Sequence, residues 1–209
     1  MKRVALLVSG ASGMALPRVL IGALARSSEI ERLHLVVSAG GSQVLRHELG
    51  AERTGAGDLA DAAGLSSEER AKLFVHRDNE LDASIASGSY RLDGTVVLPC
   101  SSGTLGALAT GSARTLVHRA GAVALKERWP LVLGFRETPL SVVHIENLRV
   151  LAYAGAHILL PIPAFYLGEP AADGAGADFG RFLDHYALRV LDRLGVTDRG
   201  APGLRWGDS

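Results

Sequence analysis

Five short apolar runs, spaced far enough apart for helices to lie between them, constrain the fold of this chain more than any other feature. They occupy residues 3–8, 33–37, 95–99, 131–135 and 157–160. Runs that are apolar at nearly every residue indicate strands buried on both faces, and such strands belong to parallel sheets that helices cover. We therefore expect one domain over residues 1–209, a doubly wound, Rossmann-like (flavodoxin-type) α/β fold with a mostly parallel sheet and helices on both faces.

The segments between these runs predict the remaining elements. Helices are expected at residues 14–26, 42–49, 66–73 (beginning at Ser66 or Ser67), 103–110, 114–127, 140–153 and 178–194, with a short strand at 74–76 and a helical turn near 80–87. Gly155 is a suitable residue to follow the helix at 140–153. The tail at 196–209 is expected to be irregular.

The composition excludes several classes of protein. The 22 basic and 22 acidic residues cancel, so nothing favours a nucleic-acid or membrane surface, and any anion site must be local. The single cysteine, Cys100, excludes an intrachain disulfide framework and fits a reducing compartment. The apolar start ends at Ser9 and Gly10, which is too short for a signal peptide or a membrane span. We expect a cytoplasmic protein.

Three of the strand ends carry turns rich in glycine and hydroxyl groups, at residues 9–13, 38–41 and 100–104. Ligands of open α/β sheets bind outside the carboxyl ends of the strands. The first turn has only Gly-x-x-Gly, and Ser38 replaces the acid that would hold a dinucleotide ribose, so a mononucleotide is favoured over NAD. The hydroxyl groups available to hold it belong to Ser12, Ser38, Ser101 and Thr104. Each turn taken alone is also compatible with an ordinary tight connection.

The strand at 131–135 ends on Arg136 and Glu137, directly before a predicted helix. Thr138 suits the N-cap of that helix and Pro139 its first position. A guanidinium beside a helix N-terminus fits an anionic ligand. The alternative is a surface ion pair at a strand end.

Other side chains are weaker candidates for an anion site. Arg119 and Lys126 lie seven residues apart on one predicted helix, hence on the same face, where they could bind one phosphate or form a solvated basic stripe. Tyr166 follows the last strand and could donate to an anion or sit at the edge of the core. We expect these cationic side chains and the three turns to meet in one cleft.

Several other chemistries lack support in the sequence. The seven histidines show no metal-ligand spacing, so no metal is predicted. No serine lies in a Gly-x-Ser-x-Gly elbow, which argues against an acyl-enzyme. Cys100 has no evident base beside it and is expected to be a buried structural thiol.

The motifs of this chain, taken together and in order, resemble the UbiX/Pad1 family of flavin prenyltransferases. They are Ser9 to Gly13, Pro99-Cys100-Ser101 with Thr104, Arg119-Ala120, Ala124 to Arg128, Arg136 to Ser141, Glu146-Asn147, Pro163 to Tyr166, and Arg205-Trp206. The resemblance implies a flavoprotein that binds reduced FMN and dimethylallyl monophosphate and attaches the prenyl group to flavin N5 and C6. It also implies that the prenylated FMN serves a UbiD-type decarboxylase, and that dodecamers hold metal-free active sites between subunits.

The resemblance assigns roles to individual residues. FMN would contact Gly10, Ala11, Ser12, Ser38, Ser101, Ser102, Gly103, Thr104 and Arg136. The prenyl phosphate would contact Arg119, Lys126, Arg136, Tyr166 and Arg189. Glu137 would be the acid beside the phosphate, and Glu48 an acid supplied from another subunit. These roles suit the chemistry, because cations stabilise charge on a leaving phosphate and a protonated Glu137 could act as its general acid.

The chain departs from the family pattern at several positions. Met14-Ala15-Leu16-Pro17 replaces a small residue followed by a Tyr-Gly pair, Ala39-Gly40 replaces Lys-Ala, and residues 171–177 look inserted. Two other functions therefore stay open, an FMN-binding carrier subunit without turnover and a flavin-dependent decarboxylase of peptidyl cysteine.

Overall fold

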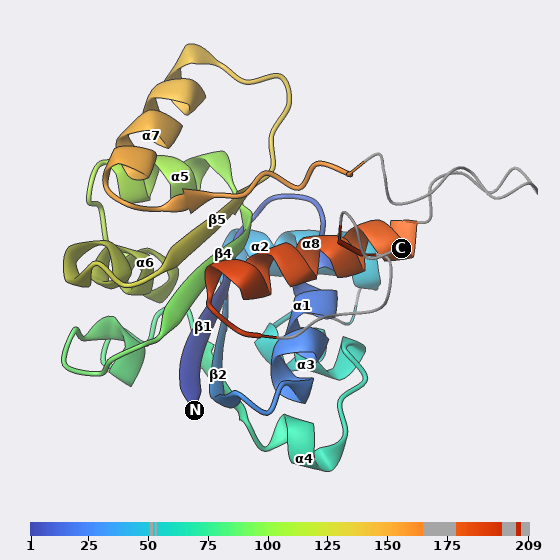
Figure 1. Ribbon diagram of the computed structural model, residues 1–209. Coiled ribbons are helices and arrows are strands. Elements are labelled where there is room, and N and C mark those ends of the chain that lie inside the picture. The colour runs from blue at the N-terminus through green and yellow to red at the C-terminus, as the bar shows by residue number, and fades with distance from the viewer. Residues whose placement is uncertain (51, 53, 165–178, 198–203, 206–209) are drawn as a thin grey trace, which may run out of the picture.

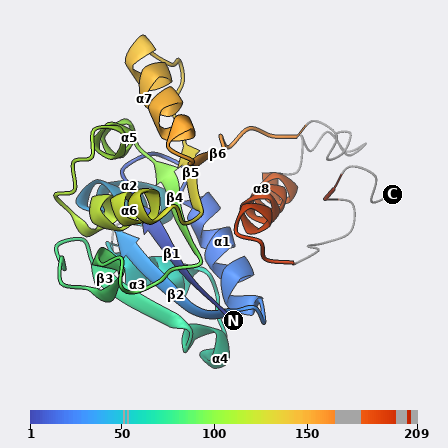
Figure 2. The same ribbon diagram turned by 60° about the vertical axis from the view of Figure 1, so that its left-hand side comes forward.

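The computed structural model describes residues 1–50, 52, 54–164, 179–197 and 204–205. It confirms the doubly wound α/β fold, with six parallel strands in the order β3-β2-β1-β4-β5-β6 (Figures 1 and 2). The strands are β1 (Lys2–Val8), β2 (Ile30–Val37), β3 (Leu73–Arg77), β4 (Gly94–Cys100), β5 (Leu131–Phe135) and β6 (His157–Ile158). The strand order reverses between β1 and β4, which makes that crevice the switch point where such sheets bind ligands.

The helices lie on both faces of this sheet. They are α1 (Ala15–Arg26), α2 (Ala39–Leu49), α3 (Ala56–Ala62), α4 (Ser67–Arg70), the 3₁₀ turn η1 (Ser84–Ala86), α5 (Ser102–Ala109), α6 (Leu116–Glu127), α7 (Val142–Tyr153) and α8 (Phe179–Arg193). None of the helices in these described ranges combines the length and the apolar character needed to cross a bilayer.

The core consists of two apolar layers, one on each face of the sheet. One layer packs α1, α3 and α8 against the strands, and the other packs α5, α6 and η1 against them. Successive side chains of a strand point to opposite faces. Leu6 of β1 therefore belongs to the first layer and Leu7 to the second, and both are 0% exposed. This burial on both faces explains why the strands read as continuous apolar runs.

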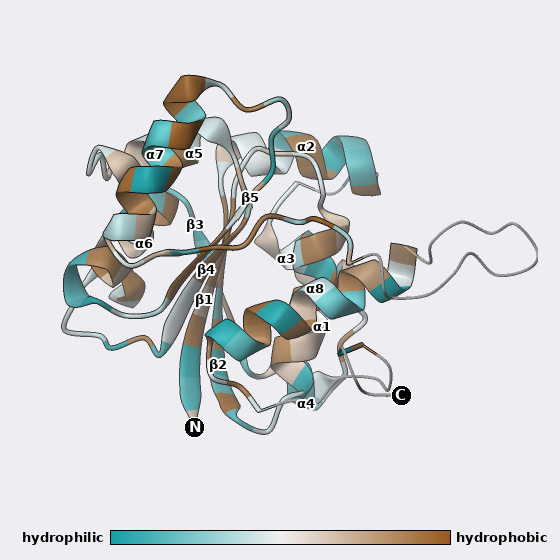
Figure 3. Ribbon diagram, turned by 45° about the horizontal axis from the view of Figure 1, so that its top comes forward, coloured by the Kyte–Doolittle hydropathy of each residue, from teal (hydrophilic) through white to brown (hydrophobic). Residues whose placement is uncertain are grey.

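Helix α7 is the exception, because it projects from the body of the molecule (Figures 1 and 2). Only Leu151 of its twelve residues is buried. Val142, Val143 and Tyr153 are 76%, 67% and 83% exposed, and Figure 3 shows several strongly apolar residues along the helix. An isolated apolar surface of this kind marks a place where another molecule binds.

Two helix starts differ from the sequence prediction. Helix α7 begins at Val142 because Ser141, not Thr138, caps it, with the His144 N–H donating to Ser141 Oγ (3.2 Å). The prediction that Pro139 occupies the first helical position is therefore wrong. Helix α2 begins three residues earlier than expected, because Ser38 Oγ accepts the Gly41 N–H (3.0 Å).

Three further differences concern short elements. Helix α3 was not expected, since residues 56–62 show no long apolar periodicity; Asp58 fixes its start by accepting the N–H groups of Thr54 and Gly55. Residue Leu73 opens β3 instead of closing the preceding helix. Strand β6 ends at Ile158, two residues before the predicted end.

A buried histidine pair ties β2 to β3 and to the segment before β4. His34 Nδ1 lies 2.9 Å from His76 Nε2, and His34 Nε2 lies 3.0 Å from the Tyr90 hydroxyl. His34 is 2% exposed. Burial, followed by the positive charges of His76 and the nearby arginines, lowers the pKa of His34 from 6.5 to about 4. His34 is therefore neutral in the folded protein at pH 5 but protonated in the unfolded chain.

We expect acidification to destabilise the fold through His34. The unfolded state binds the extra proton below pH 6.5, so between pH 7 and pH 5 the free energy of unfolding should fall by about 2 kcal/mol from this group, and further toward pH 4. Urea unfolding at several pH values measures it. The variant His34→Gln should lose about that much of the pH dependence. Equal pH slopes for the two proteins would show that His34 does not carry the effect.

Candidate active site

The turns that follow β1 and β4 flank the switch point, and one buried side chain joins them. Ser9 Oγ donates a hydrogen bond to Pro99 O (2.9 Å) and accepts one from the Ser101 N–H (2.8 Å). Ser9 is 1% exposed, so water cannot easily replace a lost partner. The two turns therefore form one unit. Only a weak signal for this role is present in the sequence, a hydroxyl residue between a buried strand and a glycine.

The turn after β1 also lies against the first turn of α2. A Cβ atom placed on Gly10 would come within 3.0 Å of Gly40 Cα, and one placed on Gly40 would lie 3.3 Å from Gly10 Cα. The two backbones approach this closely because neither residue has a side chain. This contact is a physical reason for glycine at position 40. The Ser38 N–H donates to Val8 O (2.9 Å), which fixes the third turn at the same edge.

Glu48, in the last turn of α2, binds the turn after β1 of its own chain. Its carboxylate accepts the Gly13 N–H (3.0 and 3.1 Å to the two oxygens) and the Met14 N–H (2.7 Å). Within one copy, Glu48 therefore stabilises the turn after β1. Its position in the sequence did not indicate this role. The expectation that Glu48 serves the site of another subunit stays a prediction.

The departure from the family pattern at residues 14–17 does not fill the space at these turns. Met14 is 0% and Leu16 6% exposed, and both pack into the layer between α1 and the sheet. Ser12, by contrast, is exposed. Leu16 therefore contributes to the core and leaves the Ser12 hydroxyl accessible.

Arg136 lies beside the turn after β4. Its N–H donates to Cys100 O (3.2 Å), which places it at the end of β5 next to the start of α5. Its Nε atom is buried and has no hydrogen-bond partner in the described part of the chain. A buried guanidinium nitrogen without a partner calls for an explanation, and a bound anion is one that fits its charge.

Glu137 faces the same turn. Its Oε2 atom accepts a hydrogen bond from Ser102 Oγ (3.2 Å), and its Oε1 atom accepts the Thr138 N–H (3.1 Å). The Thr138 N–H and then the Ser102 hydroxyl lower the pKa of Glu137. The carboxyl group is therefore ionised at neutral pH in the ligand-free protein. A role as a general acid requires a ligand that raises this pKa again.

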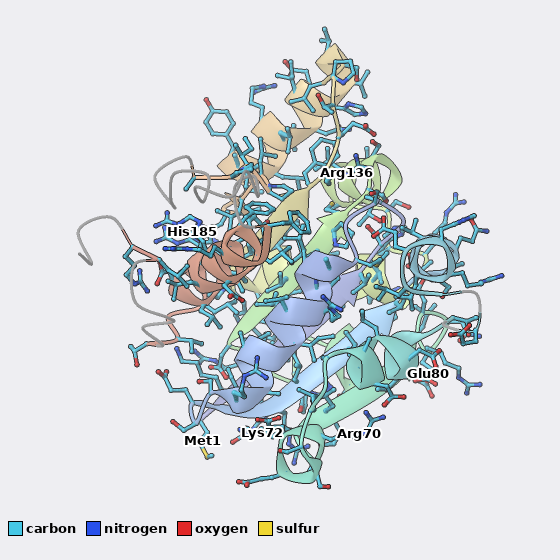
Figure 4. All side chains as sticks on the ribbon, turned by 90° about the vertical axis from the view of Figure 1, so that its right-hand side faces the viewer. Met1, Arg70, Lys72, Glu80, Arg136 and His185 are labelled. Carbon is cyan, nitrogen blue, oxygen red and sulfur yellow. The ribbon has the colours of Figure 1, made fainter. Side chains whose placement is uncertain are left out.

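The structure thus brings together eleven of the predicted site residues at the carboxyl edge of the sheet. They are Gly10, Ala11, Ser12, Ser38, Glu48, Ser101, Ser102, Gly103, Thr104, Arg136 and Glu137. Figure 4 shows Arg136 at the opposite end of the molecule from Met1 and Lys72, which precede β1 and β3.

The cationic side chains of the helices do not join this group within one chain. Lys126 pairs with Glu127, and its Nζ atom lies 2.8 Å from where a Cβ on Gly88 would be, in the segment before β4. Helix α6 therefore ends at the amino edge of the sheet, and the five residues of β5 separate Lys126 from Arg136 by roughly 17 Å. Within one copy Lys126 does not lie beside the turns, because α6 runs back against the strands. The expectation that they meet in one cleft stays a prediction for an assembly of copies.

The other predicted phosphate contacts are also outside the group. Arg119 is an exposed residue of α6, and Arg189 is an exposed residue of α8. Tyr166 lies outside the described residues. Neither arginine forms a hydrogen bond or an ion pair with the turn residues in the contacts of the described chain. The role of these side chains in binding a phosphate stays a prediction.

Two further observations limit the chemistry of the site. Cys100 is buried, and burial raises the pKa of its thiol to about 12, so it is not a nucleophile at neutral pH. In the described ranges no three His, Cys, Asp or Glu side chains gather closely enough to hold a metal ion.

A cavity of about 580 Å³ lies beside the carboxyl edge of the sheet, next to β2 and β3, with Ala39, His76 and Arg114 in its lining.

Comparison with known proteins places these observations in a family. The family model described as Flavoprotein matches residues 1–183. The chain is 39% identical over 198 residues to the flavin prenyltransferase UbiX of Deinococcus radiodurans, covering 95% of this chain and 89% of that protein. It is similar to the dodecameric FMN-dependent Ubix-like decarboxylase of Escherichia coli O157:H7, with a TM-score of 0.79 and 34% identity over 98% of each chain. It is also similar to AnUbiX (PadA1) in complex with FMN and dimethylallyl pyrophosphate, with a TM-score of 0.76, 34% identity, and coverage of 93% and 92%.

Replacing Ser9 with alanine should loosen the joined turns. The change leaves the buried Ser101 N–H without its acceptor, while Pro99 O keeps the N–H of residue 9 (3.1 Å), and it should cost about 1–3 kcal/mol in the free energy of unfolding. Ser12→Ala is the matched control, since the exposed Ser12 side chain lies in the same turn, and it should change stability by less than about 0.5 kcal/mol. Chemical denaturation measures both. If the two variants are equally stable, Ser9 does not hold the turns together.

Proposed function

This chain belongs to the UbiX flavin prenyltransferases, within the flavoprotein family, and from that premise we propose a specific reaction for it. The protein is an enzyme that uses FMN. It transfers the dimethylallyl group of dimethylallyl monophosphate to N5 and C6 of reduced FMN and releases inorganic phosphate. The observation that carries this proposal is the buried Arg136 Nε–H, which has no partner among the described residues and lies beside the turn after β4 that Ser9 joins to the turn after β1.

The turn residues would hold FMN. Backbone N–H groups at the start of α5 and the hydroxyl of Ser12 are donors that suit its phosphate and ribityl oxygens. The Ser101 hydroxyl caps α5, accepting the Thr104 N–H (3.3 Å), so it orders the turn around the ligand. The absence of an acid at Ser38 fits a mononucleotide better than a dinucleotide. Reduced FMN supplies the electron-rich ring atoms that accept the prenyl group.

Glu137 and Arg136 would act on the donor. Cleavage of the allylic C–O bond leaves negative charge on the phosphate, and the Arg136 guanidinium stabilises that charge. A phosphate dianion beside Glu137 repels its carboxylate and raises its pKa, which reverses the lowering by the Thr138 N–H and Ser102. Glu137 would then carry a proton and donate it to the leaving oxygen.

A neighbouring copy would complete the phosphate site with Arg119, Lys126 and Arg189. Lys126, at the amino edge of one copy, reaches a carboxyl-edge site only in an assembly. Helix α7 supports such an assembly, because it projects from the body (Figures 1 and 2) and exposes several apolar side chains (Figure 3). The similar protein from Escherichia coli O157:H7 is described as dodecameric. We propose a homo-oligomer, with twelve copies as the expected number.

The product would serve a UbiD-type decarboxylase in the cytoplasm, a placement suggested by the single cysteine.

Two alternative functions for this chain predict different behaviour of bound FMN. A carrier subunit would bind FMN and leave it unchanged. A peptidyl-cysteine decarboxylase would oxidise its substrate and bleach bound FMN when given a cysteine-terminated peptide.

Anaerobic incubation with reduced FMN and dimethylallyl monophosphate should give a flavin heavier by one isoprene unit in mass spectrometry. Glu137→Gln should lower the rate by about 10²- to 10⁴-fold, because the proton donor is lost, and should keep FMN bound. Glu68→Gln, which removes an exposed acid of α4, is the matched control and should keep the rate.

No mass gain with FMN bound would contradict the proposal. A Glu137→Gln variant as fast as the wild type would remove Glu137 from the chemistry. Bleaching by a cysteine-terminated peptide, without prenyl transfer, would favour the decarboxylase.

A further inference from the structure

Asp192, near the end of α8, is shared by two arginines. Arg205 contacts both of its oxygens, with Nη1 donating to Oδ2 (2.9 Å) and Nη2 to Oδ1 (2.7 Å). Arg189, one turn earlier on α8, has its Nη1 atom 3.8 Å from the same Oδ2, which exceeds hydrogen-bond distance. The two-point contact of Arg205 is the stronger of the two. Asp192 is therefore committed to Arg205.

An apolar contact holds Arg205 in this position. Leu204 is 3% exposed and packs on Leu188 of α8, which is 2% exposed. Ala164, in the segment that leaves β6, packs against the same pair. Two adjacent residues, one apolar and one charged, thus fix this part of the chain on α8 directly beside Arg189.

Positive groups outnumber negative ones among the described residues of this cluster. The guanidinium groups of Arg189 and Arg205 both face the carboxylate of Asp192, and Arg189 is the more distant of the two. His185 lies one turn before Arg189, and burial, followed by the charges of Arg189 and Arg205, lowers its pKa. His185 is therefore neutral at pH 7 and does not change this count. An exposed guanidinium with excess charge attracts an anion.

We propose that Arg205 is a positioning residue that keeps Arg189 available for the phosphate of the prenyl donor. By holding both oxygens of Asp192, Arg205 prevents that carboxylate from closing on Arg189 three residues away. This inference rests on the proposed function, in which Arg189 contacts the donor phosphate. It goes beyond that function by giving Asp192 and Arg205 opposing effects on donor binding.

The alternative is a purely structural role, in which the Arg205–Asp192 pair only anchors the C-terminal segment. The two accounts differ for Asp192. If the pair is an anchor, removing either partner does similar damage, and removing both repairs nothing. If Asp192 competes with the donor for Arg189, removing Asp192 is harmless, and it rescues the loss of Arg205.

The test uses the full-length oligomer loaded with oxidised FMN, so that donor binding is measured without turnover. Calorimetry gives the Kd of dimethylallyl monophosphate, and the reduced enzyme gives KM and kcat. Arg205→Met should raise Kd and KM about tenfold and change kcat by less than about twofold, because Asp192 then pairs with Arg189. Asp192→Asn, alone or combined with Arg205→Met, should stay within about twofold of the wild type.

Arg70→Met is the control for the substitution itself, since Arg70 pairs with Asp61 at the opposite end of the molecule from Arg136 (Figure 4), and it should leave Kd unchanged. An unchanged Kd in Arg205→Met, or a raised Kd in the double variant, would overturn the inference while leaving the transferase intact. Failure of the wild type to bind the donor with FMN in place would overturn the proposed function itself.

Discussion

The direction of the chain through a parallel sheet is the constraint on which the rest of this structure depends. Six strands run the same way, so every turn that follows a strand lies at one edge, and residues as distant in sequence as Ser9 and Ser101 are in hydrogen-bond contact there. Every helix that connects two such strands must run the other way. The same geometry that gathers the hydroxyl turns therefore carries Lys126 to the opposite edge. One copy therefore holds the expected nucleotide contacts at one edge of the sheet and Lys126 at the other.

The turns after β1 and β4 are held together by a few specific hydrogen bonds and close backbone contacts, not by a large apolar surface. The hydroxyl and the N–H of Ser9 connect the ends of β1 and β4, and two glycines let the first turn approach α2 within van der Waals distance. Glu48 satisfies the N–H groups of Gly13 and Met14 from the same side. These contacts order the turns before any ligand arrives, which reduces the entropic cost of binding one. They also explain how the chain tolerates Gly40 and Leu16 where the family pattern differs.

Most of the sheet and the carboxyl-edge group could be predicted from the sequence, because burial on both faces leaves continuous apolar runs and parallel strands place their ends together. The start of α7 could not, since Thr138 and Ser141 are both good caps and only the backbone path after β5 decides between them. The hydrogen bonds of Glu48 to Gly13 and Met14 depend on where α2 ends in space. The spacing of residues along the sequence does not show this. The direction of α6 alone would have placed Lys126 at the amino edge of the sheet. The sequence prediction placed it near Arg136 instead, because both residues belong to the motifs that resemble the family.

The central claim is that the catalytic site is completed by a second copy, and complementation between two variants tests it most directly. Arg136→Ala and Lys126→Ala should each abolish prenyl transfer when expressed alone. Mixed oligomers from equal co-expression should regain about a quarter of the wild-type rate, because one site in four then draws Arg136 and Lys126 from intact copies. No recovery in verified mixed oligomers would place both residues in the site of one chain and contradict this account.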